Sequence, residues 1–131
     1  MTPLRLVTMR RRTDCGVASL ATLLGLPYED TAEAITLTNG RLGSGLYLTS
    51  LIRAAAHLGR TLKKVKTYNP DEAEGILWVD GGTRMQHFVV LADGKVFDPQ
   101  DATLWDLSDY LSVTRCTAKT LLVLDEAPLT A

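Results

Sequence analysis

The stretch TDCGVASLATLLG, residues 13–25, decides how the rest of the chain is interpreted. It places Cys15 at the first turn of a short Ala- and Leu-rich segment that Gly25 ends, which predicts an apolar helix. The first N–H groups of a helix lack intrahelical partners and carry partial positive charge, and both properties stabilise a thiolate. Cys15 is therefore a candidate nucleophile, while a small buried cysteine in a helix would fit the same pattern.

Length and composition indicate one globular domain. The chain has 131 residues, 46% of them hydrophobic and 22% charged, so we expect residues 1–131 to form a single domain. No apolar run approaches the roughly 20 residues of a membrane span, and the N-terminus lacks the pattern of a signal peptide. We therefore expect a cytoplasmic protein with no membrane partner, in which Cys15 and Cys116 are free thiols.

The net charge of −1 conceals opposite charges in the two halves of the chain. Residues 1–66 carry 10 Lys and Arg against 4 Asp and Glu, whereas residues 67–131 carry 4 against 11. The basic residues are scattered and lack interleaved aromatic side chains, so we expect no nucleic-acid partner. Two parts of complementary charge that pack together explain the pattern. The run Arg10–Arg12 either ends a solvated strand or stabilises the thiolate and meets an acidic substrate.

The first half of the chain predicts helices. Pro27 can open a second helix, which Asn39-Gly40 ends before a Gly/Ser loop over residues 41–45. Apolar side chains that recur at positions i, i+3, i+4 and i+7 predict a third helix over residues 47–58, with Gly59 as its stop.

The second half predicts strands over residues 61–66, 75–80, 85–92, 95–98 and 120–124, with a short helix or irregular cover over residues 103–111. Helices followed by an antiparallel sheet define an α+β fold.

His87 is the candidate general base. It begins an apolar strand, whereas His57 lies near the end of the third helix and is interpreted as structural or solvated. If Asp93-Gly94 forms a two-residue hairpin turn, Val89 pairs with Asp98, and His87 shares the face of Val89. Asp98 then lies diagonally across from His87 at about 7–8 Å between Cβ atoms, close enough for its carboxylate to orient the imidazole.

These motifs together resemble the bacteriocin-processing, double-glycine-leader type of papain-like cysteine peptidase. The run TDCGVASLATLLG is similar to the nucleophile motif of that family, GLYLTSLIRAAAHLG (45–59) to its next helix, and HFVVLADGKVFDPQD (87–101) to its His/Asp hairpin. The resemblance implies a papain-like α+β fold, in which N-terminal helices that carry the cysteine pack on a C-terminal antiparallel sheet. It implies Cys15 as nucleophile, His87 as general base and Asp98 as the orienting acid. No transporter segment accompanies these motifs, so we expect a stand-alone domain.

The sequence departs from this family at Met9. Such peptidases usually have a glutamine about six residues before the cysteine, and its amide donates to the oxyanion. The thioether of Met9 cannot donate, and the loss of one donor typically lowers the rate by about 10²–10³. The backbone N–H of Cys15 remains a donor, and Thr8 or Arg10 could substitute for the missing amide. Gln86 is expected to face away from His87, because neighbours in a strand point to opposite faces.

The expected function is that of a cysteine-dependent hydrolase, a thiol peptidase or amidase that acts on a protein or peptide through an acyl-enzyme. The same triad also performs deamidation and acyl transfer. The alternative is a catalytically weakened papain-like domain that binds a protein partner, for which Met9 is the main support. Cys116 is expected to be buried and inert, and no cofactor or metal is expected, because the sequence has no CxxC, HxxxH or close Cys/His cluster. The sequence leaves the oligomeric state open.

Overall fold

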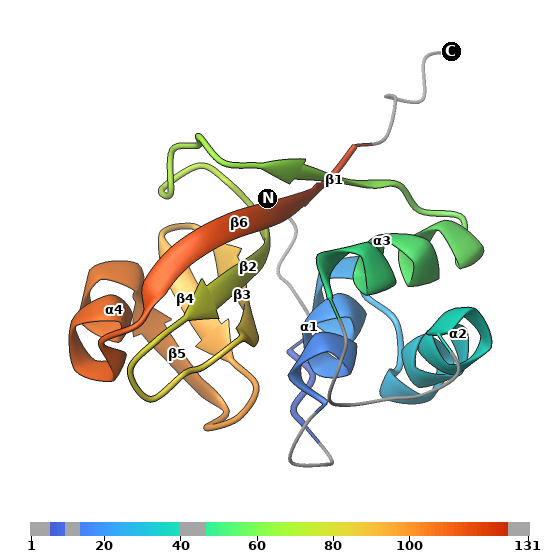
Figure 1. Cartoon of the computed structure of the whole chain (residues 1–131), viewed down its shortest axis with the longest axis horizontal. Helices are drawn as coiled ribbons and strands as arrows, with labels where there is room; N and C mark the ends of the chain where they lie inside the picture. The colour runs from blue at the N-terminus through green and yellow to red at the C-terminus, as the bar shows by residue number, and fades with distance from the viewer. Residues whose placement is uncertain (1–5, 10–13, 40–46, 126–131) are drawn as a thin grey trace.

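The structure is a computed structural model that describes residues 6–9, 14–39 and 47–125. Three helices come first in the chain, α1 (Cys15–Leu24), α2 (Tyr28–Asn39) and α3 (Leu48–His57). Five strands follow, β1 (Leu62–Val65), β2 (Gly75–Asp80), β3 (His87–Ala92), β4 (Lys95–Asp98) and β5 (Thr103–Asp106), and then α4 (Leu107–Thr114) and β6 (Thr117–Leu124) (Figure 1). Helices therefore precede a sheet, and the predicted α+β class is confirmed.

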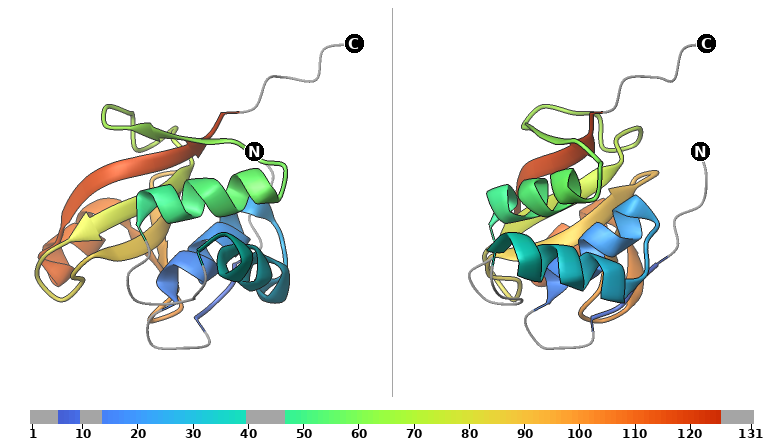
Figure 2. Two further views of the ribbon diagram at one scale, coloured as in Figure 1. Left: turned by 45° about the vertical axis from the view of Figure 1, so that its right-hand side comes forward. Right: turned by 90° about the vertical axis from the view of Figure 1, so that its right-hand side faces the viewer.

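The described strands form one six-stranded antiparallel sheet in the order β1-β6-β2-β3-β4-β5. The strand that is last in sequence, β6, lies between β1 and β2. Helices α1, α2 and α3 group on one side of the sheet, and α4 lies at the other side, next to β4 and β5 (Figures 1 and 2). The sheet thus has helices on both faces.

Two clusters of buried side chains hold these layers together. Side chains alternate along a strand, so Ile76 of β2 joins the cluster beneath α1–α3 while Leu77 joins the one beneath α4. The first cluster includes Leu20 of α1 and Leu51 of α3, both fully buried. Burial of such a side chain contributes about 1.5–3 kcal/mol, so these clusters are the main source of stability.

Helix α1 is a core helix. Every residue after Cys15 is buried, and Gly25 ends the helix in the left-handed conformation with φ 69°, as the sequence predicted. The hydroxyl of Ser19 donates to the backbone carbonyl of Phe88 at 3.2 Å, which ties α1 to β3 one residue from His87. The helix therefore has a fixed position relative to the strand that carries the candidate base.

The structure differs from the sequence-based prediction in the second half. Strand β5 was not predicted, because its side chains are mostly exposed and show no apolar alternation; pairing with β4 forms it. Strand β6 begins at Thr117, not at residue 120, and Gln86 lies outside β3. The Arg10–Arg12 run and the loop over residues 41–45 lie outside the described residues.

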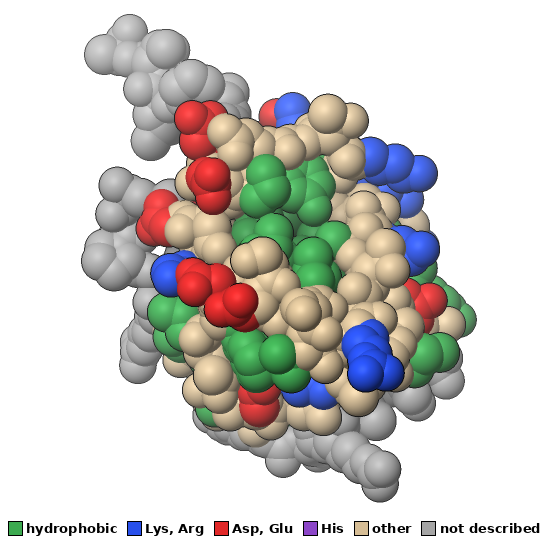
Figure 3. Space-filling model, turned by 90° about the vertical axis from the view of Figure 1, so that its left-hand side faces the viewer, with side chains coloured by type: hydrophobic (Ala, Val, Ile, Leu, Met, Phe, Trp, Pro, Cys, Tyr) green, Lys and Arg blue, Asp and Glu red, His purple; other side chains and the backbone are tan. Residues whose placement is uncertain are grey.

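The surface on the α4 side has an apolar centre. Figure 3 shows hydrophobic side chains gathered in the middle of this face, with acidic side chains along one side. Among the described helices, none combines the length and the apolar character that crossing a membrane requires.

Candidate active site

The β3–β4 hairpin brings His87 and Asp98 together as its sequence predicted. Ala92 pairs with Lys95 and Val90 with Phe97, so the same register sets Asp98 across from Val89. His87 Nε2 lies 2.7 Å from Asp98 Oδ1, and the two residues are 6% and 0% exposed. A hydrogen bond of this length between buried groups fixes the orientation of the imidazole ring.

Cys15 is the first residue of α1 and is partly buried. The preceding residue, Asp14, makes no side-chain capping bond to the helix, and its carboxylate accepts a 2.5 Å hydrogen bond from the Tyr28 hydroxyl instead. Cys15 lies close enough to His87 to raise the pKa of its imidazole. Because Asp98 occupies Nε2, Nδ1 is the ring nitrogen left for Cys15. The structure thus brings all three predicted residues together.

The surroundings of His87 favour its protonated form. Burial opposes the charge, but hydrogen bonds to Asp98 and Cys15 outweigh this effect and raise the pKa of His87 to about 9. An imidazolium is therefore favoured next to the thiol, as a thiolate–imidazolium pair requires.

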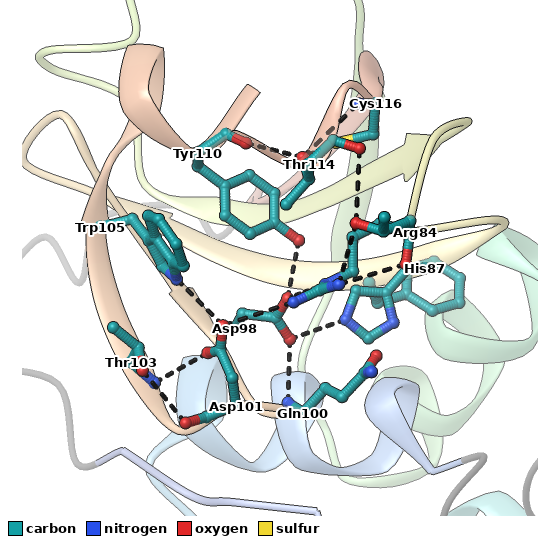
Figure 4. A network of polar contacts seen from close by, with 12 residues as sticks. Arg84, His87, Asp98, Gln100, Asp101, Thr103, Trp105, Tyr110, Thr114 and Cys116 are labelled. Carbon is teal, nitrogen blue, oxygen red and sulfur yellow. Dashed lines mark hydrogen bonds and ion pairs between the residues drawn. The ribbon is translucent and has the colours of Figure 1, made fainter. Parts of the chain in front are cut away.

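The Asp98 carboxylate accepts four hydrogen bonds (Figure 4). Oδ1 accepts from His87 Nε2 and from the backbone N–H of Gln100 at 2.8 Å. Oδ2 accepts from Arg84 Nε and from the Tyr110 hydroxyl, each at 2.7 Å. Burial alone would raise the pKa of Asp98, but the bonds from His87, Arg84 and Tyr110 hold it well below its usual range. Asp98 is thus a charged and firmly held acceptor.

Sequence reasoning missed Arg84 and Tyr110. Arg84 lies in the loop between β2 and β3, where Thr83 N–H donates to the Thr114 carbonyl at 2.9 Å and so attaches the loop to the end of α4. Gly82 makes this approach possible, because a Cβ at this position would lie 2.0 Å from the same carbonyl oxygen. In the sequence, the Asp80-Gly81-Gly82 turn indicated that a loop follows β2, but it did not indicate the contacts of Arg84.

Met9 contributes no donor to an oxyanion. Its thioether cannot donate, and its backbone N–H donates to the Pro99 carbonyl at 3.3 Å. Thr8 is exposed, and Arg10 lies outside the described residues. Gln86 precedes β3 and has a left-handed φ of 46°, so the prediction that it faces away from His87 as a neighbour in the same strand was wrong.

The surface has an open hollow of about 260 Å³ at Gln86, the residue that precedes His87 in the sequence. Its lining is mainly apolar and consists of Tyr47, Leu48, Thr49, Lys64, Trp78 and Gln86. Tyr47, just before α3, is 65% exposed and forms part of this lining.

The remaining candidates lie away from this site. His57 is exposed at the end of α3, and Cys116 is buried with its sulfur 3.0 Å from Thr114 Oγ1. Within residues 6–9, 14–39 and 47–125, no group of three or more His, Cys, Asp and Glu side chains is placed to hold a metal ion.

The fold is the papain-like α+β fold of cysteine peptidase domains, as comparison with solved structures shows. No protein-family model matches the sequence, and no relative was found among curated proteins.

One similar structure is a double-glycine motif protease from an AMS/PCAT transporter in complex with its leader peptide, with a TM-score of 0.68 and 18% identity over 95% of this chain and 93% of that one. Another is the peptidase domain of Streptococcus ComA, a bifunctional ABC transporter of a quorum-sensing pathway, with a TM-score of 0.67 and 20% identity over 94% of this chain and 98% of that one. The peptidase domain of Streptococcus mutans ComA has a TM-score of 0.61 and 21% identity over 92% of this chain and 98% of that one.

Proposed function

We propose that the protein is a cysteine peptidase or related thiol amidohydrolase that uses Cys15, His87 and Asp98. The observation that carries the proposal is the 2.7 Å bond between His87 and Asp98, next to a Cys15 that raises the pKa of the same imidazole. This is the order of nucleophile, base and orienting group that covalent acyl transfer needs. The peptidase domains of the same fold support a peptide bond as the target.

The reaction follows from these roles. His87 takes the proton of Cys15, and the thiolate sulfur forms a bond to the carbonyl carbon of an amide. Collapse of the tetrahedral intermediate breaks the C–N bond, and the amine leaves with the proton from His87. Water then attacks the thioester, with His87 as base, and releases the acid and the free thiol. Transfer to an amine in place of water, or attack on a side-chain amide, uses the same residues.

The hollow at Gln86 is the proposed binding place for a substrate side chain. It joins an apolar lining to Lys64, a combination that suits an apolar residue with an acidic neighbour. The similar structure that holds a leader peptide supports a peptide as the ligand. Tyr47→Ala is expected to raise the KM for a peptide severalfold while kcat is retained, because Tyr47 lies in the hollow and outside the triad.

Alkylation with iodoacetamide tests whether the triad is assembled. We expect the wild type to react at Cys15 at pH 7 about tenfold faster than N-acetylcysteine, because only the thiolate reacts. His87→Ala should return the rate to that of the free thiol. A wild-type rate equal to that of N-acetylcysteine and indifferent to His87→Ala would contradict the proposal and favour the alternative, a protein-binding module.

A peptide library derived from a cell digest tests the type of reaction. Incubation with wild type and with Cys15→Ala, followed by mass spectrometry, identifies products that depend on the thiol. New peptide termini that carry a common sequence indicate a peptidase. Side-chain acids without new termini indicate a deamidase, and new amide bonds indicate acyl transfer.

A further inference from the structure

The proposed reaction needs a second hydrogen-bond donor for the oxyanion. Charge develops on the carbonyl oxygen as the thiolate attacks, and donors at about 2.7–3.1 Å stabilise it. The backbone N–H of Cys15, in the first turn of α1, is one donor. Met9 supplies none, because its side chain lacks a donor and its N–H is bonded to Pro99.

Gln100 is held between the segment that contains Met9 and the His87–Asp98 pair. Its neighbour Pro99 accepts the 3.3 Å hydrogen bond from the backbone N–H of Met9. The segment that contains Met9 and precedes Cys15 therefore lies next to the turn that contains Gln100. The backbone N–H of Gln100 itself donates to Asp98 Oδ1 at 2.8 Å. The turn is closed by a 2.9 Å bond from Ala102 N–H to the Asp98 carbonyl. Gln100 therefore has a fixed backbone at the site that lacks a donor.

The side chain of Gln100 is available to a ligand. Gln100 is exposed, and within the described residues no hydrogen bond engages its amide. Figure 4 shows the amide end on the His87 side of the network, away from Tyr110 and Arg84. The Gln100 amide has the same N–H donors as the glutamine that related peptidases have at the position of Met9. It would reach the site from another segment of the chain.

We propose that the side-chain amide of Gln100 is the second oxyanion donor of this enzyme. The proposal rests on the proposed function, since only acyl transfer at Cys15 creates the oxyanion. Two other exposed donors are less suited: Thr8 offers one short hydroxyl, and Gln86 lines the hollow with Trp78 and Lys64. As the Cys15 sulfur bonds to the carbonyl carbon, the π electrons move to oxygen, where the Cys15 N–H and the Gln100 Nε2–H donate. These electrons form the carbonyl double bond again when the leaving group departs.

Two reagents separate this role from the others. Acylation of Cys15 by p-nitrophenyl acetate passes through an oxyanion and releases nitrophenolate, whereas displacement of iodide from iodoacetamide forms none. Gln100→Met preserves the length of the side chain and removes the donor. We expect it to lower the acylation rate about 10–100-fold and to leave the alkylation rate unchanged. Arg53→Met, which changes an exposed residue of α3, is the control, and we expect neither rate to change.

An exchange of the two side chains gives the sharper test. In the Gln100→Met background, Met9→Gln should restore most of the lost acylation rate, since the amide returns from the other segment. In the wild-type background, Met9→Gln should add less than about threefold, because the donor is already present. Equal acceleration in both backgrounds would mean that the wild type lacks a second donor and would overturn the proposal.

The two reagents distinguish failure of the role of Gln100 from failure of the proposed function. Normal wild-type acylation that Gln100→Met leaves unchanged overturns the role of Gln100 alone. A wild type that ester does not acylate, and that iodoacetamide alkylates no faster than free cysteine, overturns the proposed function and the role of Gln100 with it. Circular dichroism of each variant verifies the fold.

Discussion

A single carboxylate, that of Asp98, joins four parts of the chain. His87 comes from β3, Arg84 from the preceding loop, Gln100 from the following turn and Tyr110 from α4. A buried carboxylate is costly unless its oxygens are fully hydrogen-bonded, and here both accept two bonds. Arg84 also offsets the charge of Asp98, so that His87 is not the sole cation facing it.

Removal of the Arg84 charge should raise the pKa of His87. In Arg84→Met, Gln100 and Tyr110 still hold Asp98 in place, so the lost cation is the dominant change and the imidazolium becomes easier to form. Asp98 and Cys15, the groups that raise the His87 pKa, are unchanged in this variant. An NMR titration of the imidazole signals measures the change, and the exposed His57 gives the second set of signals.

Two further variants complete this test. Arg84→Lys keeps the charge and should leave the His87 pKa close to that of the wild type, and Arg53→Met removes an exposed arginine of α3 as the matched control. An unchanged or lowered His87 pKa in Arg84→Met would show that Arg84 acts through packing and not through charge.

At the scale of elements, the loop from Gly81 to Gln86 depends on close backbone contact with the end of α4. Gly82 has φ 55°, and any Cβ would meet the Thr114 carbonyl oxygen at 2.0 Å. Because Arg84 belongs to this loop, the position of the loop determines where the Arg84 guanidinium lies.

Gly82→Ala should therefore destabilise the protein more than a glycine substitution in open space. Gly59 is the matched control, since it also has positive φ, at 79°, but no atom within 4 Å of the position that a Cβ would take. We expect Gly59→Ala to lower the free energy of unfolding by about 1 kcal/mol and Gly82→Ala by about 3 kcal/mol or more. Urea denaturation measures both, and equal losses would contradict the contact with α4.

Sequence patterns were reliable where the contacts are local. The Asp93-Gly94 turn fixed the register of β3 and β4, and this register predicted the contact of His87 with Asp98. Arg84 and Tyr110 could not be found this way, because their contacts with Asp98 depend on where the β2–β3 loop and α4 pack. Strand β5 was missed for a similar reason: pairing with β4 forms it, and its own side chains carry no strand pattern.

At the scale of the whole molecule, the site couples stability to pH. The raised pKa of His87 contributes stability that is complete below the unfolded value near 6.5 and is lost as pH rises through about 9. The lowered pKa of Asp98 acts only in acid, where stability is lost as pH falls below the usual range of a carboxyl group.

Between pH 6.5 and 9.5, the free energy of unfolding of the wild type should fall by on the order of 2 kcal/mol relative to His87→Gln, which cannot titrate. Urea denaturation of both proteins at the two pH values gives the comparison. A difference between the two proteins that is independent of pH would show that folding does not favour the protonated form of His87.

The position of β6 has a consequence for synthesis of the protein. This strand lies between β1 and β2, and β2 in turn supports the strand that carries His87. During translation, β1 therefore has no strand to pair with, and one edge of β2 stays open, until β6 has been made. The β3–β4 hairpin and its contact with α1 do not involve β6, whereas β1 joins the sheet only through it. A chain that stops short of β6 therefore leaves the backbone of β1 and one edge of β2 unpaired, and such truncated chains are expected to aggregate.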